Sequence, residues 1–274
     1  MSTEDIVEEI VDKNEFDFNS ALSALSDLVD TYSSDVYIPS TKSDLKLREI
    51  NANQQKELIG SSVDNSLYNT VFIISFYKIL VELLGDEILK TLTVFDKASL
   101  VLGVRKQISD VLMVRFDEKS EESSKISLDV ILKQIKKNYQ HPKPTKLGDK
   151  KLSVTVSTPS IYTEFLYEDL MHKKEKTVND IKTSQDVKDI ISKEFLGEIS
   201  KYVKLVSMGK DHIDFDTLTF PQKIRLVEKL PSSIVQEILS KISDWKKDLE
   251  SYLIVSDDSC KQVTIKIDPI LFVN

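Results

Sequence analysis

The stretch Val36–Ile59, VYIPSTKSDLKLREINANQQKELI, predicts a β-hairpin that leads directly into a helix. A short apolar run ends at Pro39, and a polar turn follows at residues 40–43. Leu45 and Leu47 then alternate with polar residues, as expected for a strand with one buried face. This hairpin and helix form the start of the folded part of the chain.

Two asparagines in the same stretch, Asn51 and Asn53, are candidates for the N-cap of a helix that begins at Gln54. Asparagine favours this position because its side-chain oxygen accepts a hydrogen bond from an unpaired amide of the first helical turn. Apolar periodicity and capping residues predict further elements along the chain. The expected helices span residues 66–84, 97–109, 128–138, 160–172, 184–207 and 232–251, with one more starting near Pro221, and the expected strands span 111–116, 151–157 and 263–267.

Helices and strands are interspersed without strict strand–helix–strand alternation, which favours an α+β fold over a doubly wound sheet. We expect a helix-rich protein with a small mixed or antiparallel sheet. The turn-rich stretch HPKPTKLGDK, at residues 141–150, is a candidate seam between two subdomains. The expected organisation is an acidic, flexible arm over residues 1–35, an N-terminal α+β subdomain over 36–140, and a C-terminal, helix-rich α+β subdomain over 141–274.

The composition is that of an acidic globular protein. The 274 residues carry a net charge of −8, and 41% are hydrophobic while 30% are charged. This balance argues against nucleic acid as a partner, because binding to phosphates requires a basic surface. The longest apolar run, residues 71–84, contains Lys78 and Glu82 and is shorter than the ~20 residues that span a bilayer, so no membrane partner is expected. The single cysteine, Cys260, fits a reducing compartment.

The sequence lacks the motifs of common catalytic and cofactor sites. Its six glycines are scattered, and no phosphate-binding glycine loop is present. The three histidines have no cysteine or histidine neighbours at the spacing of zinc ligands. These features predict a protein with no enzyme activity, no cofactor, no metal site and no catalytic residues.

The alternative is a metal-dependent enzyme that uses the acidic residues of the segment Asp211–Asp216, DHIDFD. A carboxylate–histidine site at His212 is the form that such a site would take. However, a metal or catalytic site needs convergent groups, which this segment alone does not supply. A solvated loop in which Asp216 or Thr217 caps a helix is therefore the favoured interpretation.

Two parts of the chain carry distinctive motifs. One is the hairpin followed by a QQK helix, with Ile38, Pro39, Ser40, Gln54, Gln55 and Lys56. The other is a helix, an LP break, a second helix and a terminal β run, with Leu218, Leu230, Pro231, Ile267, Asp268 and Phe272. In these residues, which lie in parts that cover somewhat under half of the chain, the sequence resembles a known family, the baseplate hub and hub-assembly proteins of T-even-type contractile-tailed bacteriophages. The terminal run departs from the family pattern at Leu271, where a second aromatic residue would be expected before Phe272.

The resemblance implies a non-enzymatic late viral protein that helps to build the hub of the tail baseplate, as a chaperone or as a minor hub subunit. The implied partners are other phage tail or baseplate hub proteins. The implied location is the host cytoplasm during assembly, and the virion if the protein stays in the finished tail. The first of the two similar parts supplies the expected partner-contact residues, which are Tyr37, Ile38, Pro39, Gln54, Gln55 and Lys56.

Overall fold

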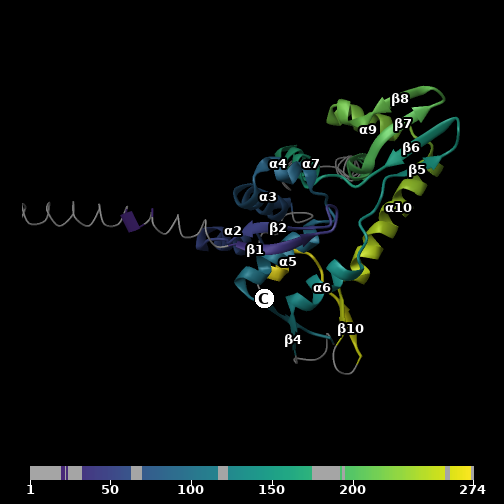
Figure 1. Ribbon diagram of the computed structural model, residues 1–274. Coiled ribbons are helices and arrows are strands. Elements are labelled where there is room, and N and C mark those ends of the chain that lie inside the picture. Colours follow the sequence, from purple (N-terminus) through teal and green to yellow (C-terminus); the bar gives the residue numbers. More distant parts are fainter. Residues whose placement is uncertain are drawn as a thin grey trace, which may run out of the picture.

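The computed structural model has an α+β fold and describes residues 33–62, 70–116, 123–174, 192, 195–256 and 260–272, together with residues 20, 21 and 23. The described strands form one four-stranded and three two-stranded antiparallel sheets. The four-stranded sheet lies at one end of the molecule, the helices α2 to α5 and α7 lie together in another part, and α10 extends along one side (Figure 1). A small antiparallel sheet was one of the two expected forms. The expected arm, residues 1–35, lies mostly outside the described residues.

The hairpin and helix expected at the start of the fold are present. Strands β1 (Ser33–Ile38) and β2 (Ser43–Arg48) pair in antiparallel register, and helix α2 (Ala52–Ser62) follows. The Asn51 side chain accepts a hydrogen bond from the Gln54 amide at 3.0 Å, and the Gln54 side chain accepts one from the Asn51 amide at 2.9 Å. This reciprocal capping pair makes Asn51 the N-cap, so the helix begins two residues before the expected start.

The helical part of the core forms around α3 (Thr70–Leu84) and α5 (Lys97–Ile108), with the short helix α4 (Asp86–Thr91) between them. Nearly every residue of α5 from Ala98 to Arg105 is buried. A Cβ atom placed on Gly103 would lie 2.5 Å from Val36 Cγ2, so the glycine lets β1 pack directly against this helix. Helix α7 (Ile161–Lys174) packs on α3, where the rings of Tyr77 and Phe165 stack with centroids 3.8 Å apart.

A second hairpin follows α5. Strand β3 (Val111–Val114) pairs with β4 (Ser124–Ser127), and helix α6 (Leu128–Asn138) continues directly from β4. The Ser127 hydroxyl accepts a hydrogen bond from the Asp129 amide at 3.2 Å, which makes Ser127 the N-cap of the expected helix. Residues 118–125 are rich in charge and serine, which is typical of a loop, but β4 begins within this stretch at Ser124 because β3 supplies a hydrogen-bonding partner.

The four-stranded sheet has the order β5-β6-β7-β8. Its strands are β5 (Thr145–Gly148), β6 (Leu152–Val156), β7 (Val203–Met208) and β8 (Asp211–Asp214). Strand β6 matches the expected strand, whereas β5 lies in the expected connector. The helix expected over residues 184–207 is wrong at its C-terminal end, because the chain is helical over 195–202 and then continues as β7.

The elements that follow β8 in the sequence connect this sheet to the helical core. A single 3₁₀ turn, η3 (Phe215–Thr217), leads to helix α9 (Phe220–Glu228), and helix α10 (Ser232–Ser251) follows as expected. Helix α10 runs from β5 of the four-stranded sheet to a third hairpin, formed by β9 (Ile254–Ser256) and β10 (Gln262–Thr264) (Figure 1). The expected terminal strand is thus shorter than predicted, and the described chain closes with η4 (Pro269–Phe272).

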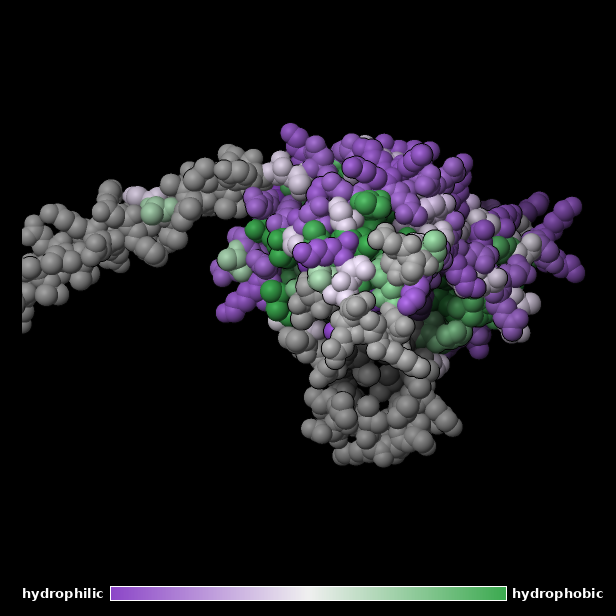
Figure 2. All heavy atoms as spheres, turned by 90° about the horizontal axis from the view of Figure 1, so that it is seen from below, coloured by the Kyte–Doolittle hydropathy of each residue, from purple (hydrophilic) through white to green (hydrophobic). Residues whose placement is uncertain are grey.

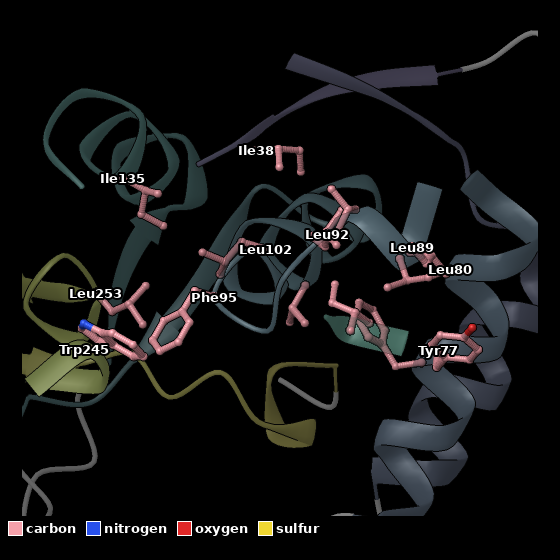
Figure 3. Close-up of a cluster of buried hydrophobic side chains, with 14 of the residues drawn as sticks. Ile38, Tyr77, Leu80, Leu89, Leu92, Phe95, Leu102, Ile135, Trp245 and Leu253 are labelled. Carbon is pink, nitrogen blue, oxygen red and sulfur yellow. The ribbon is translucent and has the colours of Figure 1, made fainter. Parts of the chain in front are cut away.

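One hydrophobic cluster connects elements on both sides of the expected boundary near residue 140. Ile38, Leu102 and Ile135 lie in the same cluster as Trp245 and Leu253 from the C-terminal part of the chain (Figure 3). Phe95 makes an edge contact with Trp245, with ring centroids 6.4 Å apart. The described parts of the two expected subdomains therefore share a core. Among the described residues, no helix is long and apolar enough to cross a membrane.

Candidate functional site

The six residues expected to contact a partner do not lie on one exposed surface. Ile38 is only 1% exposed and Gln54 only 9%, and Pro39 is buried as well. The Gln54 side chain is also occupied within the chain, because its amide donates to the Glu82 carboxylate at 2.6 Å in addition to its capping bond with Asn51. These three residues stabilise the fold, and their burial removes them from any surface that a partner can reach.

The other three expected contact residues, Tyr37, Gln55 and Lys56, are exposed or half-buried. The Tyr37 ring lies 5.2 Å from the ammonium of Lys136, which forms an ion pair with Asp44 at 2.8 Å. Gln55 and Lys56 lie on α2 rather than on the hairpin. A role of these three residues in partner contact stays a prediction.

The acidic segment Asp211–Asp216 does not form a metal site in this structure. Asp211, Asp214 and Asp216 are all exposed. Asp214 accepts a hydrogen bond from the Asp216 amide at 2.9 Å and caps η3, while Thr219 is the N-cap of the helix α9 that follows. The expected helix cap at Asp216 or Thr217 is therefore wrong. Within the described ranges, no three histidine, cysteine, aspartate or glutamate side chains gather closely enough to hold a metal ion. The geometry therefore does not favour the metal-dependent alternative.

An ionic cluster joins α7, the helix at residues 195–202 and α10, with the Lys201 and Glu168 side chains largely shielded and those of Glu198 and Lys246 exposed. The Lys201 ammonium forms ion pairs with Glu168, at 3.8 Å, and with Glu198, and it also lies 4.5 Å from the centroid of the Tyr167 ring. Glu198 in turn pairs with Lys246 at 3.1 Å. These contacts connect three elements that are far apart in the sequence.

Burial and charge act in opposite directions on the groups of this cluster. Burial raises the pKa of the Glu168 carboxyl, and the nearby Lys201 offsets this shift only in part. Burial alone would lower the pKa of Lys201, but Glu198, Glu164 and Glu168 outweigh it and hold this pKa above its ordinary value. Because each charge has an oppositely charged neighbour, we assign the cluster a structural role in joining the helices.

A groove of about 640 Å³ lies between the second and third hairpins. This volume is within the range of ~300–1,000 Å³ that is typical of ligand-binding pockets. One wall comes from β4 and the first turns of α6, and the other comes from the end of α10 and the strands β9 and β10. The lining residues are Lys125, Ile126, Ser127, Val130, Gln134, Ser251, Ile254, Val255, Ser256 and Gln262.

The groove wall on α6 follows from the helix geometry. Leu128, Ile131 and Ile135 are buried and turn the helix toward the core. Val130 and Gln134, four residues apart, therefore share the opposite side, which faces the groove. The exposed fraction of Val130 is 59%, the highest among the exposed large apolar side chains of the described residues.

Further apolar side chains are exposed beside this wall. Val111 and Met113 lie on the outer face of β3, and Met113 is 46% exposed. The strand register places Met113 opposite Lys125 and Val111 opposite Ser127, so both border residues that line the groove. Figure 2 views the molecule from the end that carries the two hairpins, where apolar surface interrupts a largely hydrophilic exterior.

The described lining of the groove offers apolar side chains, hydroxyls and side-chain amides. Among the described lining residues, Lys125 is the charged one, and none is a histidine, cysteine or carboxylate. No local pattern in the sequence indicates this groove, because β4 and β9 form by pairing with β3 and β10 rather than through an apolar alternation of their own. Comparison of the chain with protein-family models, with curated proteins and with solved structures found no match in any of the three.

Proposed function

We propose that this protein is a non-enzymatic assembly factor or minor subunit of the baseplate hub of a contractile phage tail, and that it acts through protein–protein contacts. The resemblance of its hairpin–helix start and of its C-terminal region to hub and hub-assembly proteins supports the class of function. Its partners are then other tail or baseplate hub proteins. It acts in the host cytoplasm during assembly, and it remains in the tail baseplate if it is a hub subunit.

The observation that supports a protein–protein contact is the exposed apolar surface of Val111, Met113 and Val130, which borders the groove. Exposed apolar side chains that gather at one place favour a site of association, because covering them removes apolar surface from water. Three of the eight large apolar residues that are exposed in the described chain lie on β3 and α6 beside the groove, so this surface is the first to test.

The first experiment is a pull-down of the full-length tagged protein from cells that produce the phage tail proteins, with mass spectrometry of the complexes and of purified particles. Recovery with hub proteins from the lysate, together with absence from particles, is the result expected of a chaperone. Presence in both fractions is the result expected of a hub subunit. Recovery of no tail protein would overturn the proposal.

A pair of matched variants tests whether the surface beside the groove makes the contact. The double variant Met113→Gln and Val130→Gln removes apolar character without adding charge, and we expect it to recover at least about tenfold less partner, corresponding to about 1.4 kcal/mol. The control is Phe195→Gln with Met208→Gln, which changes two apolar residues of similar exposure on other elements. Equal recovery by both variants would place the contact elsewhere on the molecule.

A further inference from the structure

The groove between the second and third hairpins runs along the edges of two strands. It contacts three successive residues of β4, Lys125, Ile126 and Ser127, and three successive residues of β9, Ile254 to Ser256. Successive side chains of a strand point to opposite faces of its sheet. A groove that touches all three residues of a strand therefore contacts the edge of that strand, where the backbone is accessible.

Within the part of the chain that the structure describes, each of these strands has one neighbour in its sheet. Strand β4 pairs with β3, and β9 pairs with β10, in two separate two-stranded sheets. A strand with one neighbour presents unpaired backbone amides and carbonyls along its other edge. The groove is thus bounded by two strand edges that can still form backbone hydrogen bonds.

The hydrogen bonding of the second hairpin identifies which backbone groups of β4 face the groove. The Leu128 amide donates to the Asp110 carbonyl at 2.8 Å, so these two residues form a hydrogen-bonded pair. Hydrogen-bonded and non-hydrogen-bonded pairs alternate along an antiparallel ladder. The pair of Met113 and Lys125, three positions along the ladder, is therefore non-hydrogen-bonded, and the amide and carbonyl of Lys125 point away from β3.

The same rule applies to the opposite wall. The Ile265 amide donates to the Leu253 carbonyl at 2.9 Å, and the next pair along the ladder is Thr264 with Ile254. The amide and carbonyl of Ile254 therefore point away from β10. Both walls thus present backbone donors and acceptors at their edges.

The side chains of the lining add specificity to this backbone chemistry. Ile126, Val130 and Ile254 provide apolar contacts, and Lys125 provides the only charge among the described lining residues. Lys125 forms no ion pair with the other described residues. The groove therefore suits an extended chain that carries apolar side chains and one carboxylate.

We propose that an extended segment of a partner protein, with alternating apolar residues and an acidic residue, binds in this groove as an added strand on the edge of β4. The backbone of the segment pairs with Lys125, its carboxylate pairs with the Lys125 ammonium, and its apolar side chains contact Ile126 and Val130. About four residues, or about 13 Å of extended chain, match the length of β4. This inference rests on the proposed function, because it names the kind of partner segment that the same surface takes.

The test uses the full-length protein and a displayed library of random peptides of about ten residues, which is long enough to extend beyond β4. We expect enriched peptides to alternate apolar residues and to contain Asp or Glu. Hydrogen exchange with the best synthetic peptide should slow at the amides of Lys125 and Ser127, which face away from β3. Failure to enrich any peptide, or slowed exchange confined to other elements, would overturn the proposal.

Two variants separate the backbone contact from the charge. Lys125→Pro removes the amide that faces the groove, and we expect at least about tenfold weaker peptide binding. Lys125→Glu keeps the amide and reverses the charge, so it should weaken peptides with a carboxylate and spare a version of the peptide with glutamine in its place. Binding that neither variant weakens would show that no strand is added at β4.

The control for the proline is Lys146→Pro, at the edge of another sheet. The Asp149 amide donates to the Leu152 carbonyl at 2.9 Å, so the pair of Lys146 and Thr155, three positions along the ladder, is non-hydrogen-bonded and the Lys146 amide also points away from the neighbouring strand. Circular dichroism establishes that all variants fold. A dimer of the wild-type protein that Lys125→Pro dissociates in sedimentation analysis would identify a second copy as the occupant, and would overturn the proposal of a different partner.

The pull-down described above distinguishes this inference from the proposed function. If wild-type protein and Lys125→Pro recover the same tail proteins equally well, strand addition is wrong while the assembly role stands. If neither recovers any tail protein, the assembly role is wrong. Selective loss of partners from Lys125→Pro, but not from Lys146→Pro, would support both.

Discussion

At the scale of single residues, a buried carboxylate joins the first hairpin to the turn before α5. Asp96 is fully buried, and its two oxygens accept hydrogen bonds from the Ser40 amide at 2.9 Å and from the Thr93 amide at 2.8 Å. The Thr93 hydroxyl donates a third bond to it at 2.9 Å. Replacement of this one side chain would leave the two backbone amides without their acceptor, which is costly when water cannot take its place.

We therefore predict that Asp96→Ala lowers the free energy of unfolding by about 3–5 kcal/mol. Each of the three lost hydrogen bonds to a charged group costs about 1.5–3 kcal/mol, and removal of a buried carboxylate from the interior offsets part of their sum. Asp96→Asn should cost less, since its amide oxygen still accepts from one of the two backbone amides. Urea unfolding of both variants measures the difference. A loss below about 0.5 kcal/mol for Asp96→Ala would contradict this account of the turn.

A second residue of this region, His141, should make stability depend on pH. Burial lowers the pKa of His141 below its ordinary value of 6.5, although the nearby carboxylate of Asp96 opposes this shift. The ring also lies 2.8 Å from the Thr93 hydroxyl and makes an edge contact with Phe95. Because the unfolded chain binds a proton at His141 more readily than the folded chain does, acidification favours unfolding.

We predict that the contribution of His141 to stability is fully present above a pH of about 6.5 and is lost as the pH falls toward the lowered pKa of the folded state. The measurement is urea unfolding of wild-type protein and His141→Gln at about pH 7.5 and about pH 5. The variant should lose less stability on acidification, because glutamine does not titrate. The same loss in both proteins would show that other groups cause the pH dependence.

At the scale of secondary structure, the contact between β1 and α5 depends on the absence of a side chain. A Cβ atom on Gly103 would meet Val36 at 2.5 Å, and Val36 is itself buried and cannot move into open space. Gly60, on α2, is the opposite case, because a Cβ atom there would meet nothing within 4 Å. Alanine at Gly60 therefore changes helix propensity alone, whereas alanine at Gly103 changes both helix propensity and core packing.

We predict that Gly103→Ala lowers the free energy of unfolding by about 1–2 kcal/mol, because overpacking of a core costs about 1–3 kcal/mol and exceeds the gain in helix propensity of about 1 kcal/mol. Gly60→Ala should instead raise the free energy of unfolding by about 0.5–1 kcal/mol. Thermal and urea unfolding of the pair measure both signs. Stabilisation by both substitutions would mean that β1 is not packed closely on α5.

At the scale of the whole molecule, the end of the described chain closes on the beginning of the fold. The ring of Phe272 lies 5.7 Å from that of Phe72 and 6.4 Å from that of Phe76, both on α3. Beside it, the Leu271 carbonyl accepts a hydrogen bond from the guanidinium of Arg105 at 2.7 Å. These contacts join segments that are more than one hundred and sixty positions apart in the sequence.

We predict that Phe272→Ala lowers the free energy of unfolding by about 3–5 kcal/mol, the usual cost of removing a buried phenylalanine ring. Phe272→Leu should cost less, because it keeps most of the buried volume. The heat-induced unfolding transition should stay single, since one hydrophobic cluster connects both parts of the chain. Two separate transitions in Phe272→Ala would instead indicate that the two expected subdomains unfold independently.

Local signals in the sequence were sufficient for the elements that carry their own stabilising residues. Helix α6 begins after its Ser127 cap, and α10 spans the expected residues with Ile234, Ile238, Ile242 and Trp245 buried on one side. The first hairpin also follows from its alternation and its turn. In these cases the residues that define an element are close together in the sequence, so their periodicity and caps identify it.

Strand β7 shows why local patterns failed elsewhere. Val203 and Val206 are three residues apart, a spacing typical of one face of a helix. In the sheet, Val206 lies opposite Val154 and Val203 lies opposite Val156, so β7 has one residue more than β6 in this interval. This irregularity, a β-bulge, places both valines on the buried face. The partner strand is about fifty positions away, and no local pattern contains it.

The sequence by itself determined the α+β class, the capped helices and the first hairpin. Only the tertiary structure decided that Ile38, Pro39 and Gln54 face the interior, and that the edges of β4 and β9 border one groove. The physical reason is that burial and strand pairing depend on residues distant in the sequence. Helix hydrogen bonds join residues four positions apart, whereas the walls of this groove come from segments more than one hundred positions apart.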